Sequence, residues 1–95
     1  MSLVERSGTS LKVTAPMMFS DAVALRVAGA AALTPEVSEI DLSAVTEADS
    51  AALAVLFSWL RDARKLNTSL RIANPPAGLL SLAALYGVDD FLPLA

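Results

Sequence analysis

The chain has 95 residues and a formal net charge of -3, and it contains neither cysteine nor histidine. This composition excludes disulfides and thiolate chemistry, and it argues against hydrolytic or metal-dependent catalysis because the commonest general base and metal ligand is missing. No basic stripe is present to bind nucleic acid. We therefore expect no enzyme, no metal site and no cofactor. Because only 18% of the residues are charged and 55% are hydrophobic, we expect exposed apolar surface that a partner covers.

The ends and the uncharged segments predict a cytoplasmic protein. The N-terminal residues lack a basic region followed by an apolar one, so no signal peptide is indicated. The longest uncharged run, residues 72–88, is interrupted by two prolines and two glycines, which argues against a membrane span. The length fits one domain, and we expect it to cover residues 1–95.

The first predicted elements are two short strands. Residues 3–4 begin a strand, and residues 7–10 contain the serine and glycine typical of a turn. Residues 11–15 then alternate between apolar and polar side chains, which is the period of a half-buried strand. We expect the two strands to pair as a hairpin.

Helices and strands alternate in the remainder of the chain. A helix rich in alanine, valine and leucine is predicted over residues 21–32. A strand follows over residues 37–45, and a second helix begins at Asp49 or Ser50 and runs to about Asn67.

The last predicted strand covers residues 69–73 and ends before two prolines, which cannot donate to a sheet ladder. A final helix over residues 77–86 precedes Gly87, which suits a left-handed helix cap. The order predicts an α/β fold in which a mixed four-stranded β-sheet is packed by three or more α-helices.

The second helix is apolar on more than one side. Four large residues form a stripe that suffices to dock on the sheet: Leu53, Leu56, Phe57 and Leu60. Val55 and Trp59 are neighbours on another side, close to Ala51. Two interpretations are open. Another helix covers Val55 and Trp59, or these residues form a protein-binding face, for which tryptophan is a favoured residue.

Asp49 and Ser50 also allow two interpretations. Both residue types cap helices, and capping alone would explain them. Catalysis by this pair is not expected, because no histidine is available to activate the serine. The alternative is that they mark the centre of a docking surface.

Four segments together resemble the STAS domain, the family named after sulfate transporters and anti-sigma factor antagonists: "IDLSAV", "TEADSAALAVLFSWLRDARK", "LRIANPP" and "LAALYGVDDFL". The resemblance covers residues 11–94. It implies a mixed four-stranded sheet packed by helices. It also implies a non-catalytic protein that binds partners through the loop after the third strand and the start of the second helix.

The motif itself distinguishes two branches of this family. In anti-sigma factor antagonists a kinase phosphorylates the second hydroxyl residue after the aspartate, and Ala51 occupies that position here. We therefore expect no phosphorylation of this kind at Ala51. The STAS subunits of the Mla lipid-transport ABC system have one hydroxyl residue followed by small ones, which Ser50, Ala51 and Ala52 match.

The resemblance implies an accessory subunit that binds the ATPase of a phospholipid-trafficking ABC transporter. The protein would then lie at the inner membrane only through that complex, and the isolated subunit could self-associate. The alternative partner is an anti-sigma factor or kinase. We predict six partner-binding residues: Asp49, Ser50, Ala51, Ala52, Val55 and Trp59.

Overall fold

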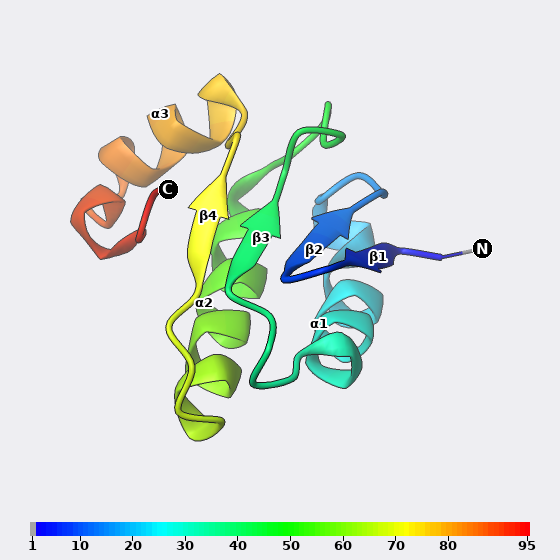
Figure 1. The fold of residues 1–95 in the computed structure, drawn as a ribbon. Helices are drawn as coiled ribbons and strands as arrows, with labels where there is room; N and C mark the ends of the chain where they lie inside the picture. The colour runs from blue at the N-terminus through cyan, green and yellow to red at the C-terminus, as the bar shows by residue number, and fades with distance from the viewer. Residues whose placement is uncertain (1) are drawn as a thin grey trace.

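The computed structural model describes residues 2–95 and confirms the predicted fold class (Figure 1). The strands are β1 (Val4–Ser7), β2 (Ser10–Val13), β3 (Glu39–Asp41) and β4 (Arg71–Ala73). The helices are α1 (Ala22–Ala32), α2 (Ser50–Lys65) and α3 (Ala77–Leu85), with short 3-10 turns η1 (Phe19–Asp21) and η2 (Asp89–Phe91). Within residues 2–95, no helix is both long enough and apolar enough to cross a membrane.

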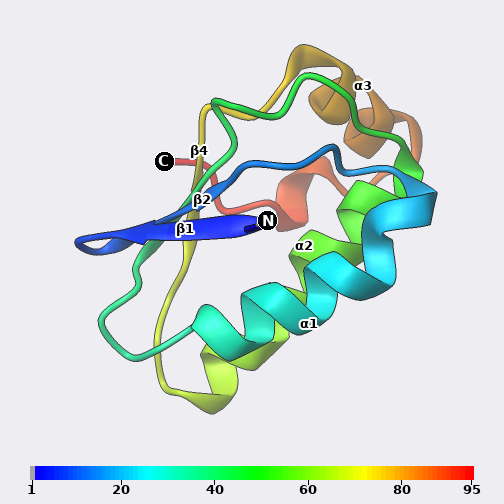
Figure 2. The ribbon, with the colours of Figure 1, turned by 90° about the vertical axis from the view of Figure 1, so that its right-hand side faces the viewer.

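The strands lie in the order β1-β2-β3-β4, with the hairpin antiparallel and the other two pairs parallel. The hairpin turn contains Gly8 at a positive φ of 61°, a conformation that glycine adopts without strain. β2, β3 and β4 lie in the sheet in the same order as in the chain. Because the crossovers between parallel strands are right-handed, α1 and α2 must cover the same face of the sheet. Figure 2 shows these two helices as a layer beside the sheet, with α3 beyond the end of β4.

The two faces of the sheet differ in chemistry. Leu11, Val13, Ile40 and Ile72 point to the helices and are buried, as their alternation predicts. The other face is open and polar, and its cross-strand neighbours include Glu5 opposite Lys12 and Lys12 opposite Asp41. Adjacent opposite charges of this kind stabilise a sheet modestly and keep the open face hydrated.

β3 and β4 are shorter than the sequence predicts, since each has only three residues. At the end of β3 the Asp41 carboxylate accepts hydrogen bonds from the Ser43 N–H at 2.9 Å and from the Asn74 amide at 3.1 Å. The first bond turns the chain out of the sheet, and the second joins the ends of both strands. The Asn74 bond also makes the largest contribution to holding the pKa of Asp41 below its usual value.

The C-terminal residues cover the outer edge of β4. The Ile72 N–H donates to the Pro93 carbonyl at 2.8 Å, and the Ala95 N–H donates to the Ile72 carbonyl at 2.9 Å. Leu94 thereby forms an isolated parallel bridge with Ile72. Backbone groups of β4 that would otherwise face solvent are satisfied by this tail.

Candidate functional site

Asp49 joins the starts of two helices. It is the N-cap of α2, and its carboxylate accepts hydrogen bonds from the Ala51 N–H and the Phe19 N–H, both at 2.9 Å. The first bond satisfies a free amide at the helix start, which confirms the predicted capping role. The second bond crosses 30 positions of the sequence and fixes η1 against α2.

The loops before α1 and α2 also pair through their backbones. The Met17 N–H donates to the Glu47 carbonyl at 2.9 Å, and the Asp49 N–H donates to the Met17 carbonyl at 3.2 Å. Met17 and Ala48 thus form an isolated parallel bridge. Both helices consequently begin at the same edge of the molecule, the edge at which β2 and β3 end.

The predicted motif is only partly at the surface. Ser50 is the first residue of α2 and is exposed, whereas Asp49 and Ala51 are half-buried. Ala52 is completely buried in the core. A partner that approaches this edge can therefore contact the first three residues of the motif but not Ala52.

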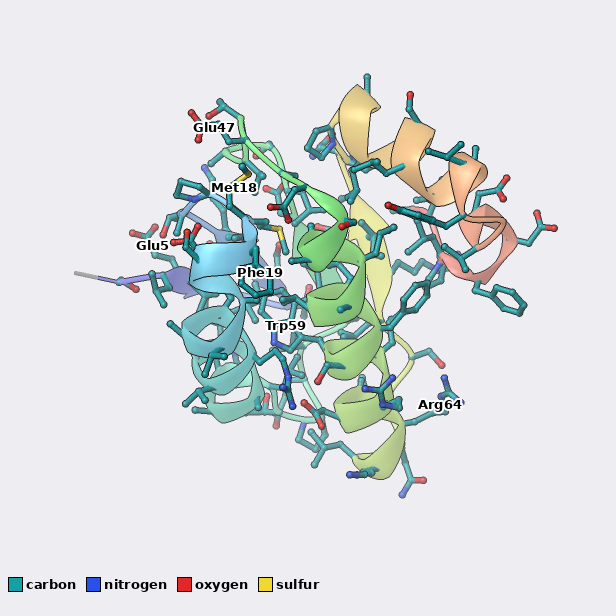
Figure 3. The ribbon with its side chains drawn as sticks, turned by 180° about the vertical axis from the view of Figure 1, so that it is seen from behind. Glu5, Met18, Phe19, Glu47, Trp59 and Arg64 are labelled. Carbon is teal, nitrogen blue, oxygen red and sulfur yellow. The ribbon has the colours of Figure 1, made fainter. Side chains whose placement is uncertain are left out.

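The prediction that Val55 and Trp59 form an exposed protein-binding face is wrong, because both side chains are buried. The alternative interpretation is confirmed, since α1 covers them. Trp59 lies between α1 and α2 (Figure 3), and its indole N–H donates to the Arg26 carbonyl at 3.4 Å. α1 comes this close because it presents Gly29, and a Cβ atom at that position would stand 2.1 Å from the indole ring.

An exposed apolar surface lies instead on α1 and on the turn before it. Phe19 is 82% exposed, Val23 73% and Val27 66%. They are four positions apart and therefore line one side of the helix. We call these three residues the α1 ridge. The sequence indicates such a surface, because residues 22–32 have apolar side chains on every side of the helix. A helix cannot bury all of its sides against one sheet.

The α1 ridge borders the motif across a shallow groove between α1 and α2. One hollow of about 380 Å³ is lined by Phe19, Ala22, Val23, Arg26, Asp49, Ser50, Ala51, Ala54 and Val55. A second hollow of about 270 Å³ continues it along the helices and shares Val23 and Arg26. Small alanines form much of the floor, so an apolar side chain or a helix of another protein would fit closely.

The polar groups of the groove come from Asp49, Ser50, Arg26 and Ser58, and from Asp62 in the second hollow. The Asp49 carboxylate is committed to two backbone amides, and the Arg26 guanidinium donates to the Ser58 hydroxyl at 3.4 Å. Ser50 adds an exposed hydroxyl at the start of α2. The chemistry of the groove is therefore apolar contact around a few hydrogen-bonding groups, which is typical of the centre of a protein interface.

Comparison with known proteins gives consistent matches. A family model described as "Mlab, STAS domain" matches residues 3–94. Over 63 residues the chain is 40% identical to the intermembrane phospholipid transport system binding protein MlaB of Haemophilus influenzae. That alignment covers 66% of this chain and 60% of the relative, so the chain spans about three fifths of the relative's length.

Two solved structures share the fold. A putative anti-sigma factor antagonist from Thermotoga maritima has a TM-score of 0.72 at 14% identity, and the match covers 96% of this chain and 82% of that one. The murine solute carrier 26 family member A9 anion transporter has a TM-score of 0.69 at 15% identity, covering 90% of this chain and 15% of the transporter. At such identities the likeness concerns the fold alone.

Proposed function

The chain belongs to the STAS domain family, and from that premise we propose that it is a non-catalytic accessory subunit that binds the ATPase of a phospholipid-trafficking ABC transporter. The name of the Haemophilus relative supports the transport system. The motif of Asp49, Ser50 and two alanines supports the same branch. The subunit would reach the inner membrane through the transporter complex.

The observation that carries the proposal is the α1 ridge beside the motif. Three large apolar side chains stand in solvent along the groove whose end is formed by Asp49 and Ser50. Their burial by a partner would be favourable by ~25 cal/mol for each Å² of apolar area, before the entropic cost of association. We propose that the ATPase inserts apolar side chains into this groove, with Ser50 at its edge.

The second candidate function is an anti-sigma factor antagonist. The fold likeness to the Thermotoga protein favours it. Ala51 argues against it, because the position where that branch carries its phosphorylated hydroxyl has none. Ser50 is the neighbouring exposed hydroxyl, so phosphate on Ser50 after incubation with an anti-sigma kinase would favour this candidate.

Capture of the ATPase by the tagged protein tests the leading proposal. We expect the parent and Ser50→Thr to bind, and Val23→Asp and Ser50→Arg to bind at least ~10-fold more weakly, as expected for changes near an interface centre. Ser50→Arg removes no cap, because Asp49 fills that role, and its arginine opposes the helix dipole by only ~0.5 kcal/mol. Val23 is exposed, so its change to aspartate should also leave the fold intact, and both variants should remain folded.

Leu85→Asp is the matched control. Leu85 is 77% exposed, about as much as Val23, but it lies at the end of α3, outside the groove. Its change to aspartate should leave capture of the ATPase unaltered. Failure of the parent to capture any ATPase would overturn the proposal that the protein is an ATPase-binding subunit. Equal binding by the parent, Val23→Asp and Ser50→Arg would show that the groove is not the surface that binds the ATPase.

A further inference from the structure

A second apolar surface lies between α2 and η2. Phe91 is 70% exposed, and Leu85 and Tyr86 at the end of α3 are also exposed. Phe91 also lines a hollow of about 400 Å³, together with Phe57, Leu60, Arg61, Arg64 and Val88. We call this region the η2 surface. It shares no lining residue with the groove beside the α1 ridge.

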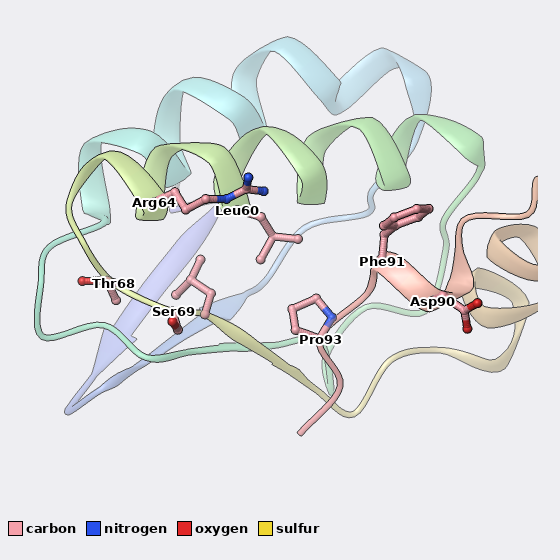
Figure 4. A pocket seen from close by; sticks show the side chains of 8 residues that line it. Leu60, Arg64, Thr68, Ser69, Asp90, Phe91 and Pro93 are labelled. Atoms are coloured by element: carbon pink, nitrogen blue, oxygen red, sulfur yellow. The ribbon is translucent and has the colours of Figure 1, made fainter.

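The charges of the η2 surface are divided between its two sides. Arg61 and Arg64 come from α2, whereas Asp89 and Asp90 come from η2. Figure 4 shows the side chains of Leu60 and Arg64 on α2, with Phe91 and Asp90 on the facing segment. A neighbouring hollow of about 340 Å³ includes both Arg64 and Asp90 in its lining. The surface is thus basic on one side, apolar in the middle and acidic on the other.

This pattern is complementary to itself under a two-fold rotation. In a two-fold interface the same patch is used on both molecules, so residue i of one meets residue j of the other, and the reverse. If the axis passes near Phe91, the arginines of each copy face the aspartates of its partner. The apolar side chains then meet at the centre, where they are removed from water.

We propose that the occupant of the η2 surface is a second copy of this chain, packed by a two-fold axis near Phe91. This dimer does not depend on the proposed function, because it uses a separate surface. A standard interface covers ~800 Å² of each partner, which is about 15% of the 5317 Å² surface of the chain. We expect the exposed Leu85 and Tyr86 to contribute with Phe91 to an interface of that size.

Sedimentation equilibrium over a concentration series tests the proposal with the purified chain. We expect a reversible monomer–dimer equilibrium. Arg64→Asp and Asp90→Arg should each raise the dissociation constant ~10-fold, because each places like charges opposite one another. The double variant reverses both partners and should restore the dissociation constant to within ~3-fold of the parent. Nonspecific apolar aggregation would show no such restoration.

Two further comparisons determine whether the right surface has been assigned. Phe91→Ser should weaken the dimer, whereas Val23→Ser on the α1 ridge should leave it unchanged. Circular dichroism melting checks that each variant is folded. A parent that stays monomeric at all concentrations overturns the proposal and leaves the η2 surface to a different partner. A dimer that Val23→Ser dissociates, or that the charge-reversed double variant fails to form, also overturns it.

Discussion

The two sides of α1 have similar composition, but one is buried and the other is exposed. The inner side, with Leu25 and Gly29, closes over Trp59 and excludes water. The outer side, with Val23 and Val27, stays open. Hydrophobicity does not distinguish them, since both sides are apolar. What differs is shape. The inner side presents Gly29, which has no side chain and so leaves room for the indole ring of Trp59. Close packing rather than apolar character therefore decides which side belongs to the core.

The largest expected effect comes from removing the indole. Trp59→Ala should lower the free energy of unfolding by ~3–5 kcal/mol, because it leaves a cavity between α1 and α2 and removes the bond to the Arg26 carbonyl. Urea denaturation followed by circular dichroism measures this loss. A change below ~1 kcal/mol would mean that the contact between the helices contributes little to stability.

Gly29→Ala should be the next most damaging change. The new methyl group would stand 2.1 Å from an atom of the indole ring, so the helices must separate or the ring must rotate. Overpacking of this kind costs ~1–3 kcal/mol, although alanine is the better helix former in isolation. In a Trp59→Leu background the same substitution should cost less, since the clash partner is smaller. Equal costs in both backgrounds would contradict the proposed contact.

Asp49→Ala tests the link between the two helix starts. It removes one cap bond and one bond to the Phe19 N–H, and we expect a loss of ~1–2 kcal/mol. Ser50→Ala, one position further, should change stability by no more than ~0.5 kcal/mol because Ser50 is exposed. If the two substitutions cost the same, the cap has been assigned to the wrong residue.

The smallest effect on stability is expected on the outer side of α1. Val23→Ser should alter the free energy of unfolding by ~0.5 kcal/mol or less, because the side chain is already in water. Binding of a hydrophobic dye to the folded protein should decrease at the same time. A large loss of stability would show that the α1 ridge packs within the protein and is not free for a partner.

The sequence predicts the sheet and its inward residues well, since strict alternation identifies Leu11, Val13 and Ile72 without any knowledge of neighbours. It also predicts a helix cap at Asp49 or Ser50, of which Asp49 is the cap, and the left-handed conformation of Gly87, whose φ is 69°. These features are local. Each depends on residues within a few positions of one another.

The site depends on contacts that local patterns do not reveal. A helical pattern shows that Trp59 is apolar and off the sheet-facing stripe, but whether α1 covers it depends on the order of the strands. Likewise, nothing near Asp49 in the sequence indicates its bond to the Phe19 N–H, 30 positions away. The pattern therefore predicts Ser50 at the surface, where it lies, but it wrongly predicts Val55 and Trp59 there and does not identify the residues of the α1 ridge.

The tail that pairs with Ile72 has a consequence for solubility. A bare edge strand presents unpaired amides and carbonyls, which form a template for adding strands from other molecules. The bonds to Pro93 and Ala95 occupy that template on the β4 side. Detachment of the last three residues would uncover it. Slow assembly into intermolecular β-structure would then begin at β4.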